Sequence, residues 1–98
     1  MVMMTLNEAR EPVPCNDPVT WALWVGENNR RVAYDELPQA TVSTVFLGID
    51  TIGGPFETMV FGDRGERRAA FRYQTWADAE AGHASIVRAI KEQAPQGD

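Results

Sequence analysis

Two neighbouring stretches of the chain, residues 41–49 and 56–61, carry apolar side chains on both of the faces that an extended strand would present. Both are rich in β-branched and aromatic residues, which favour strands. A strand with one solvated face would alternate apolar and polar residues, so this pattern predicts central strands that are covered on both sides. A glycine pair and a proline interrupt the pattern between them. We therefore predict a β-hairpin whose connection spans residues 50–55.

Three other stretches have the composition of strands. Residues 19–25 alternate, with Trp24 on the face opposite to the other large apolar side chains. Residues 30–34 are more polar, and their two arginines suit an edge strand that must not pair with other chains. Residues 67–73 have one apolar and one polar face. The sequence thus predicts up to five strands in one antiparallel sheet.

One amphipathic helix is predicted to begin at Thr75. Thr75 and Asp78 have the spacing of a capping box, in which each side chain pairs with a backbone N–H at the start of the helix. Pro95 and Gly97 are typical of the region just after a helix end. The apolar stripe of this helix recurs at helical spacing and consists of Trp76, Ala79, His83, Ile86, Val87 and Ile90.

These elements predict an α+β domain, an antiparallel sheet of four to five strands with one C-terminal helix packed on one face. We expect an irregular arm at residues 1–18, where prolines are frequent, a single domain at 19–93 and a short tail at 94–98. One helix covers only one face of the sheet. Because the central strands are apolar on both faces, either the arm or a second copy must cover the other face. We favour a homodimer through this uncovered sheet face.

Composition narrows the classes of function. The chain has 98 residues, a net charge of −5 and a single cysteine, Cys15. The negative charge argues against direct binding of nucleic acid, and one cysteine excludes an intrachain disulfide or a cysteine-based metal cluster. No apolar run approaches the roughly 20 residues needed to cross a bilayer, and the first residues lack the pattern of a signal peptide. We expect a cytoplasmic protein with no membrane association, no cofactor and no bound metal.

Two polar residues fall in apolar surroundings. His83 lies within the apolar stripe of the predicted helix. It is either an acid/base group or metal ligand paired with Asp50 or Glu57, or a core histidine that donates to a strand carbonyl, with Gly82 letting helix and sheet approach. We favour the core histidine, because the chain has no second histidine. Glu57 interrupts an apolar strand and is predicted to pair with an arginine of the last strand, the alternative being a carboxylate pair with Asp50.

A basic cluster within this acidic chain consists of Arg64, Arg67, Arg68 and Arg72. It is either a small site for an anion or a set of solvated side chains that offset nearby acids, which is the interpretation we favour. The glycines of the 50–55 connection could hold a phosphate through backbone N–H groups, but their spacing matches no known phosphate loop and predicts a plain turn. Trp24, on its own face of the predicted strand, is the best candidate for an interface anchor.

The chain resembles a family of small uncharacterised proteins of tailed phages and prophages in four segments, 42–50, 56–62, 72–76 and 81–83. The resemblance spans about residues 20 to 90, and the hairpin is its most specific part. Members of that family often have a histidine directly after the aspartate, where this chain has Thr51. The resemblance implies a phage-encoded accessory protein in the cytoplasm of the bacterial host, without a known activity.

The sequence therefore favours a small non-enzymatic protein that acts by contact with a host or phage protein, with anti-CRISPR-like counter-defence by occlusion as one role. Two alternatives remain open: a protein that binds or sequesters a small anionic nucleotide, and a small hydrolase built on Asp50, Glu57 and His83. The candidate binding residues are Trp24, Asp50, Glu57, Arg68, Arg72 and His83. No residue is predicted to be catalytic in the favoured interpretation.

Overall fold

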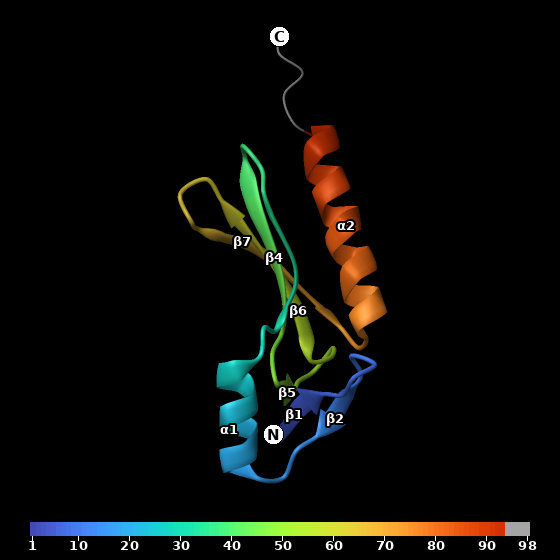
Figure 1. Ribbon diagram of the computed structural model, residues 1–98. Helices are drawn as coiled ribbons and strands as arrows, with labels where there is room; N and C mark the ends of the chain where they lie inside the picture. Colours follow the sequence, from blue (N-terminus) through green and yellow to red (C-terminus); the bar gives the residue numbers. More distant parts are fainter. Residues whose placement is uncertain (94–98) are drawn as a thin grey trace.

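The computed structural model describes residues 1–93, which form two antiparallel sheets and two helices (Figure 1). The larger sheet has the strand order β3 (Arg31–Glu36), β4 (Ala40–Phe46), β6 (Phe56–Gly62) and β7 (Arg67–Tyr73). The smaller sheet has the order β2 (Pro12–Pro14), β1 (Val2–Leu6) and β5 (Ile49–Asp50). The helices are α1 (Pro18–Glu27) and α2 (Trp76–Gln93). The predicted α+β class is confirmed, and the predicted tail at 94–98 lies outside the described residues.

The predicted hairpin is the centre of the larger sheet. β4 and β6 pair antiparallel, from Ala40 opposite Gly62 to Phe46 opposite Phe56. Burial alternates strictly along both strands, so one face is buried and the other is only partly covered. The predicted cover on the second face is therefore absent from the described chain, and cover by a second copy stays a prediction. The apolar residues of the second face stand among polar ones such as Ser43, which tolerate contact with water.

Helix α2 covers the buried face of the larger sheet and contacts all four of its strands (Figure 1). The Thr75 half of the predicted capping box is present, since the Asp78 N–H donates to the Thr75 hydroxyl over 3.0 Å. At the other end, the Gln39 side chain donates to the Ile90 carbonyl over 3.0 Å and ties the helix to the β3–β4 turn. Gly82 lies against the ring of Tyr73, where any Cβ would overlap it. The predicted close approach at Gly82 is thus confirmed.

Residues 19–25 form most of helix α1 and not the predicted strand. Asp17 is the N-cap and accepts from the Val19 N–H, and Pro18 occupies the first turn, where its missing N–H costs nothing. Hydrogen bonds from the Thr20 hydroxyl and from the Val19 N–H hold the pKa of Asp17 below its ordinary value. The alternation of apolar residues in 19–25 suggests a strand. The N-cap Asp17 and the following Pro18 are a helix start, and this start decides the structure.

Residues 1–18 are not an irregular arm, because they supply β1 and β2 to the smaller sheet. β2 lies at the edge of the smaller sheet. Prolines have no N–H to donate to a neighbouring strand, so Pro12 and Pro14 are tolerated at this position. β1 also pairs with β5, which follows β4 after the positive-φ residue Gly48. The Gly48 carbonyl accepts from the Met4 N–H and from the Trp21 indole, each over 2.8 Å. One carbonyl thereby joins the smaller sheet and α1 to the end of β4.

A row of four aromatic rings links the two helices through the sheet. Trp24 of α1 meets Phe46 edge to face at 5.8 Å, Phe46 meets Phe56 at 5.2 Å, and Phe56 meets Trp76 of α2 at 6.1 Å between ring centroids. Phe46 and Phe56 are completely buried, and Met4 and Leu6 of β1 pack against the same cluster. The smaller sheet therefore packs at the α2 side of the larger one.

Because the N-terminal strands pack there, they do not cover the opposite face of the larger sheet. The alternative in which residues 1–18 seal that face is wrong. Across residues 1–93, neither helix is both long and apolar enough to span a membrane.

Candidate functional site

We call the sheet face opposite α2 the open face. Side chains of all four strands of the larger sheet contribute to it: Arg31, Tyr34, Glu36, Thr41, Ser43, Val45, Glu57, Met59, Phe61, Arg67, Ala70 and Arg72. The middle of this face is a strip in which Tyr34 lies opposite Ser43, Ser43 opposite Met59, and Met59 opposite Ala70. Tyr34 is 40% exposed, and the other three are half-buried. The strip is broad, without deep burial, and carries tyrosine and methionine, which are frequent in protein interfaces.

Charged side chains border the strip along both outer strands. Arg31 on β3 lies over the ring of Tyr34, 4.4 Å from its centroid. On the other side, the Arg72 Nε donates to Glu57 over 2.9 Å. The predicted ion pair of Glu57 with an arginine of the last strand is confirmed. Arg67 forms no ion pair within residues 1–93.

The open face is bounded at one end by the connection between β5 and β6. Arg72 donates from its Nη1 to the Thr51 hydroxyl, and a Cβ at Gly53 would lie 2.8 Å from the Arg72 Cβ. The connection is a tight turn, in which the Gly54 N–H donates to the Thr51 carbonyl over 2.9 Å. This hydrogen bond uses the Gly54 N–H within the turn, so that N–H is not free to hold a phosphate. The segment is therefore a plain turn, as the sequence favoured.

His83 lies on the other side of the sheet, in a buried chain of polar groups. Its Nδ1 is 2.7 Å from the Thr44 hydroxyl, which also contacts the Thr58 hydroxyl, and its Nε2 is 2.7 Å from the Asp35 carboxylate. With a neutral imidazole that carries its proton on Nε2, the chain runs from Thr58, which donates to Thr44, through Thr44, which donates to Nδ1, while Nε2–H donates to Asp35. His83 is thus a core histidine, as favoured, but its partners are side chains and not the predicted strand carbonyl.

The predicted triad of Asp50, Glu57 and His83 does not form. Glu57 projects from the open face, while the Thr58 next to it faces α2 and His83. Asp50 belongs to the smaller sheet, where it pairs in register with Val2. Because a general base must lie within hydrogen-bond reach of its partner, the hydrolase built on these residues is ruled out by geometry.

The Thr44 hydroxyl provides a test of the buried chain. We expect Thr44→Val to lower the free energy of unfolding by about 1–3 kcal/mol, because it leaves His83 Nδ1 and the Thr58 hydroxyl without their partner. Thr41→Val is the matched control, since Thr41 lies in the same strand but is half-exposed on the open face, and it should change stability by less than about 0.5 kcal/mol. Urea denaturation followed by circular dichroism measures both. Equal losses would contradict a structural role for the chain.

Two other predicted sites are arranged differently from expectation. Trp24 packs on Phe46 within the core and is not an exposed interface anchor. The four clustered arginines do not converge on one point, because Arg72 binds Glu57 while Arg68, near the other end of β7, lies 3.7 Å from Glu66. Arg68 and Arg72 offset nearby acids, as the favoured interpretation held, whereas Arg64 and Arg67 form no ion pair within residues 1–93.

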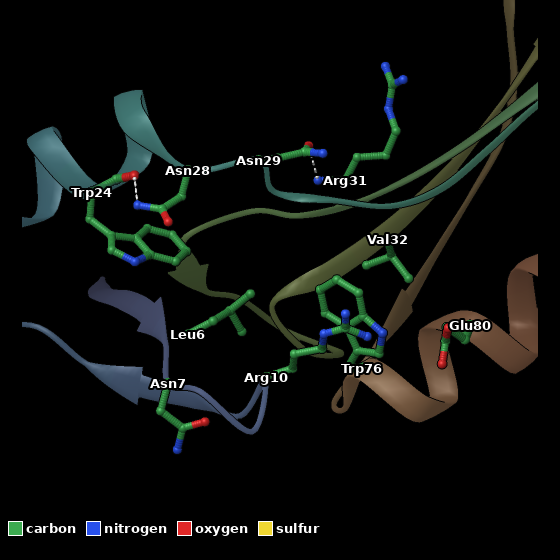
Figure 2. Close-up of a pocket in the computed structure, with 10 residues that line it drawn as sticks. All are labelled: Leu6, Asn7, Arg10, Trp24, Asn28, Asn29, Arg31, Val32, Trp76 and Glu80. Carbon is green, nitrogen blue, oxygen red and sulfur yellow. Dashed lines mark hydrogen bonds between the residues drawn. The ribbon is translucent and has the colours of Figure 1, made fainter.

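A cleft of about 530 Å³ lies where β1 and the turn after it, the end of α1, β3 and the first turns of α2 meet (Figure 2). Its walls include Leu6, Trp24 and Trp76, and Arg10 lies over the Trp76 ring, 4.6 Å from its centroid. Neither Arg10 nor Glu80, which also lines the cleft, is among the residues predicted to form a site. No spacing could have linked them, because they come from separate elements that meet only in the folded chain.

Within residues 1–93 no three histidine, cysteine, aspartate or glutamate side chains group closely enough to hold a metal ion. Comparisons of the chain with models of known protein families, with curated proteins and with solved structures find no match. Function is therefore inferred from the side chains themselves.

Proposed function

We propose that this protein acts by stoichiometric binding of another protein through the open face. The observation that carries the proposal is the strip of exposed Tyr34 and half-buried Ser43, Met59 and Ala70, which no described element of the chain covers. Exposed apolar surface of this kind on a small domain marks an interaction site. A flat sheet face suits contact with a protein surface better than enclosure of a small molecule.

The charges of the open face indicate the chemistry of the partner. Arg31, Arg67 and Arg72 on this face outnumber Glu36 and Glu57, whereas the whole chain has 14 acidic residues and 9 basic ones. The open face is therefore a basic surface on an acidic protein. Electrostatic complementarity favours a partner whose contact surface combines apolar groups with an acidic rim.

The resemblance to small proteins of tailed phages supports a role for this binding in the bacterial cytoplasm. In this proposal the chain covers a working surface of a host or phage protein and so blocks it. Counter-defence of the anti-CRISPR kind is one form that such occlusion takes. No catalytic step is required, and none of the residues on the open face is arranged for one.

Capture experiments with two matched variants test the proposal. Tyr34 is 40% exposed on the open face, and Phe71 is 44% exposed on the α2 side of β7. We expect Tyr34→Ala to weaken capture of the partner from a host lysate at least about tenfold, because tyrosine is a typical interface hot spot. Phe71→Ala should capture as wild type does. Identification of the captured protein by mass spectrometry, and binding measured with that protein purified, complete the test. Equal capture by both variants would overturn the proposal.

The homodimer predicted from the sequence would use the same face, so a second copy and a different partner cannot occupy it at once. Static light scattering on the purified chain shows whether a second copy occupies the open face. A particle of twice the monomer mass that Tyr34→Ala converts to a monomer assigns the open face to a second copy. A monomer leaves the face free for the partner proposed here.

A further inference from the structure

The cleft on the α2 side carries features that neither the fold nor the open face explains. It joins three segments that are distant in sequence, residues 6–10, 24–32 and 76–80. Two indole rings, those of Trp24 and Trp76, line it together with Leu6 and Val32. The exposed lining of the cleft is mainly polar, and the two rings give it flat surfaces on which a planar group can stack.

Arg10 is the most unusual residue of the cleft. Its φ of 62° is left-handed, and it is the one residue other than glycine with a positive φ among those described. This backbone conformation is unfavourable for arginine, yet it places the guanidinium over Trp76. No carboxylate of residues 1–93 forms an ion pair with Arg10. One face of the guanidinium rests on the indole, so its other face and its N–H edge are available to an anion.

The remaining polar groups of the cleft include a donor without a partner. The Trp76 Nε1 is buried and has no hydrogen-bond acceptor in the described chain. Asn28 uses its Nδ2 to cap the Trp24 carbonyl over 2.9 Å, which leaves its Oδ1 as an acceptor. Glu80 offers a carboxylate on the α2 side (Figure 2). The cleft thus has one unpaired cation, flat apolar walls, and acceptors for N–H groups.

We propose that this cleft binds a nucleoside monophosphate. The phosphate binds the N–H edge of the Arg10 guanidinium, and the base stacks on the guanidinium face that points away from Trp76. Glu80, on the α2 side of the cleft, accepts from an N–H group of the base. Arg31 supplies no second phosphate contact, because its guanidinium lies over Tyr34 and points away from the cleft (Figure 2).

Titration of the ¹⁵N-labelled protein with AMP and with UMP tests the proposal. The chain has three tryptophans, so three indole N–H signals appear, and Trp76→Phe identifies the one from Trp76. We expect AMP to shift this signal saturably, and adenosine or inorganic phosphate alone to bind at least about tenfold more weakly. If neither nucleotide moves it at about 10 mM, the proposal is wrong. If inorganic phosphate binds as tightly as AMP, the site is a simple anion site and the ring contact is overturned.

Arg10→Gly removes the guanidinium cation from the cleft and keeps the backbone of the turn. Glycine adopts the left-handed backbone of residue 10 freely, so the turn should keep its shape while AMP binding falls at least about tenfold. Arg88→Ala removes an exposed arginine of α2 and should bind AMP as wild type does. Equal AMP affinity in Arg10→Gly and wild type would remove Arg10 from the site and contradict the proposal.

Discussion

Gly54→Ala is expected to unfold the protein or to lower its free energy of unfolding by about 3–5 kcal/mol. Gly54 has a φ of 122°, which is strained for any residue with a Cβ. A Cβ there would also overlap the backbone carbonyl of Tyr73, at the point where β7 leaves the sheet. A backbone atom cannot rotate away as the end of a side chain can, so the turn or the strand end must move. Urea denaturation followed by circular dichroism gives the size of the loss.

Gly65→Ala is the matched control for this substitution. Gly65 also has a positive φ, 78°, but no atom lies within 4 Å of the position of an added Cβ. We expect a loss of only about 1–2 kcal/mol, the cost of a left-handed backbone alone. Similar losses in the two variants would show that the contact of Gly54 with Tyr73 does not matter.

Phe46→Ala should lower the free energy of unfolding by about 3–5 kcal/mol. Phe46 is completely buried and lies in the row of four rings between Trp24 and Phe56. Its removal leaves a cavity at the point where the smaller sheet, α1 and the larger sheet meet. For a domain of about this size the melting temperature should fall by roughly 15–30 °C.

Phe71→Ala provides the comparison, because Phe71 is 44% exposed and lies outside the buried cluster. We expect a change in melting temperature of a few degrees at most, on the order of 1 kcal/mol. A loss as large as that of Phe46→Ala would place the main core elsewhere than at the aromatic row.

The parts of the fold that could be predicted have strong local signals. The hairpin of β4 and β6 follows from β-branched and aromatic runs that flank a glycine pair, and α2 follows from its cap at Thr75 and its apolar stripe. Glu57 was correctly paired with the last strand, because a carboxylate in an apolar strand needs a cation. Each of these inferences depends on residues that are close in sequence or in neighbouring strands.

The parts that could not be predicted depend on choices between competing signals or on distant contacts. The run at 19–25 has strand-like composition, and its helical state follows from Asp17 and Pro18 before it. The partners of His83 are Asp35 and Thr44, which are 48 and 39 residues away in the chain. Nothing local indicates which polar side chains will face a buried imidazole. The cleft of Arg10 and Trp76 was missed for the same reason.

The Gly48 carbonyl is a shared attachment point for the smaller sheet and α1. Its carbonyl oxygen has two lone pairs, and both are used, one by Met4 and one by Trp21. Because both hydrogen bonds end on one peptide group, a shift of the backbone at Gly48 would disturb the smaller sheet and α1 together. Movement of these elements away from the core would expose Phe46 and dismantle the cleft while leaving the open face in place.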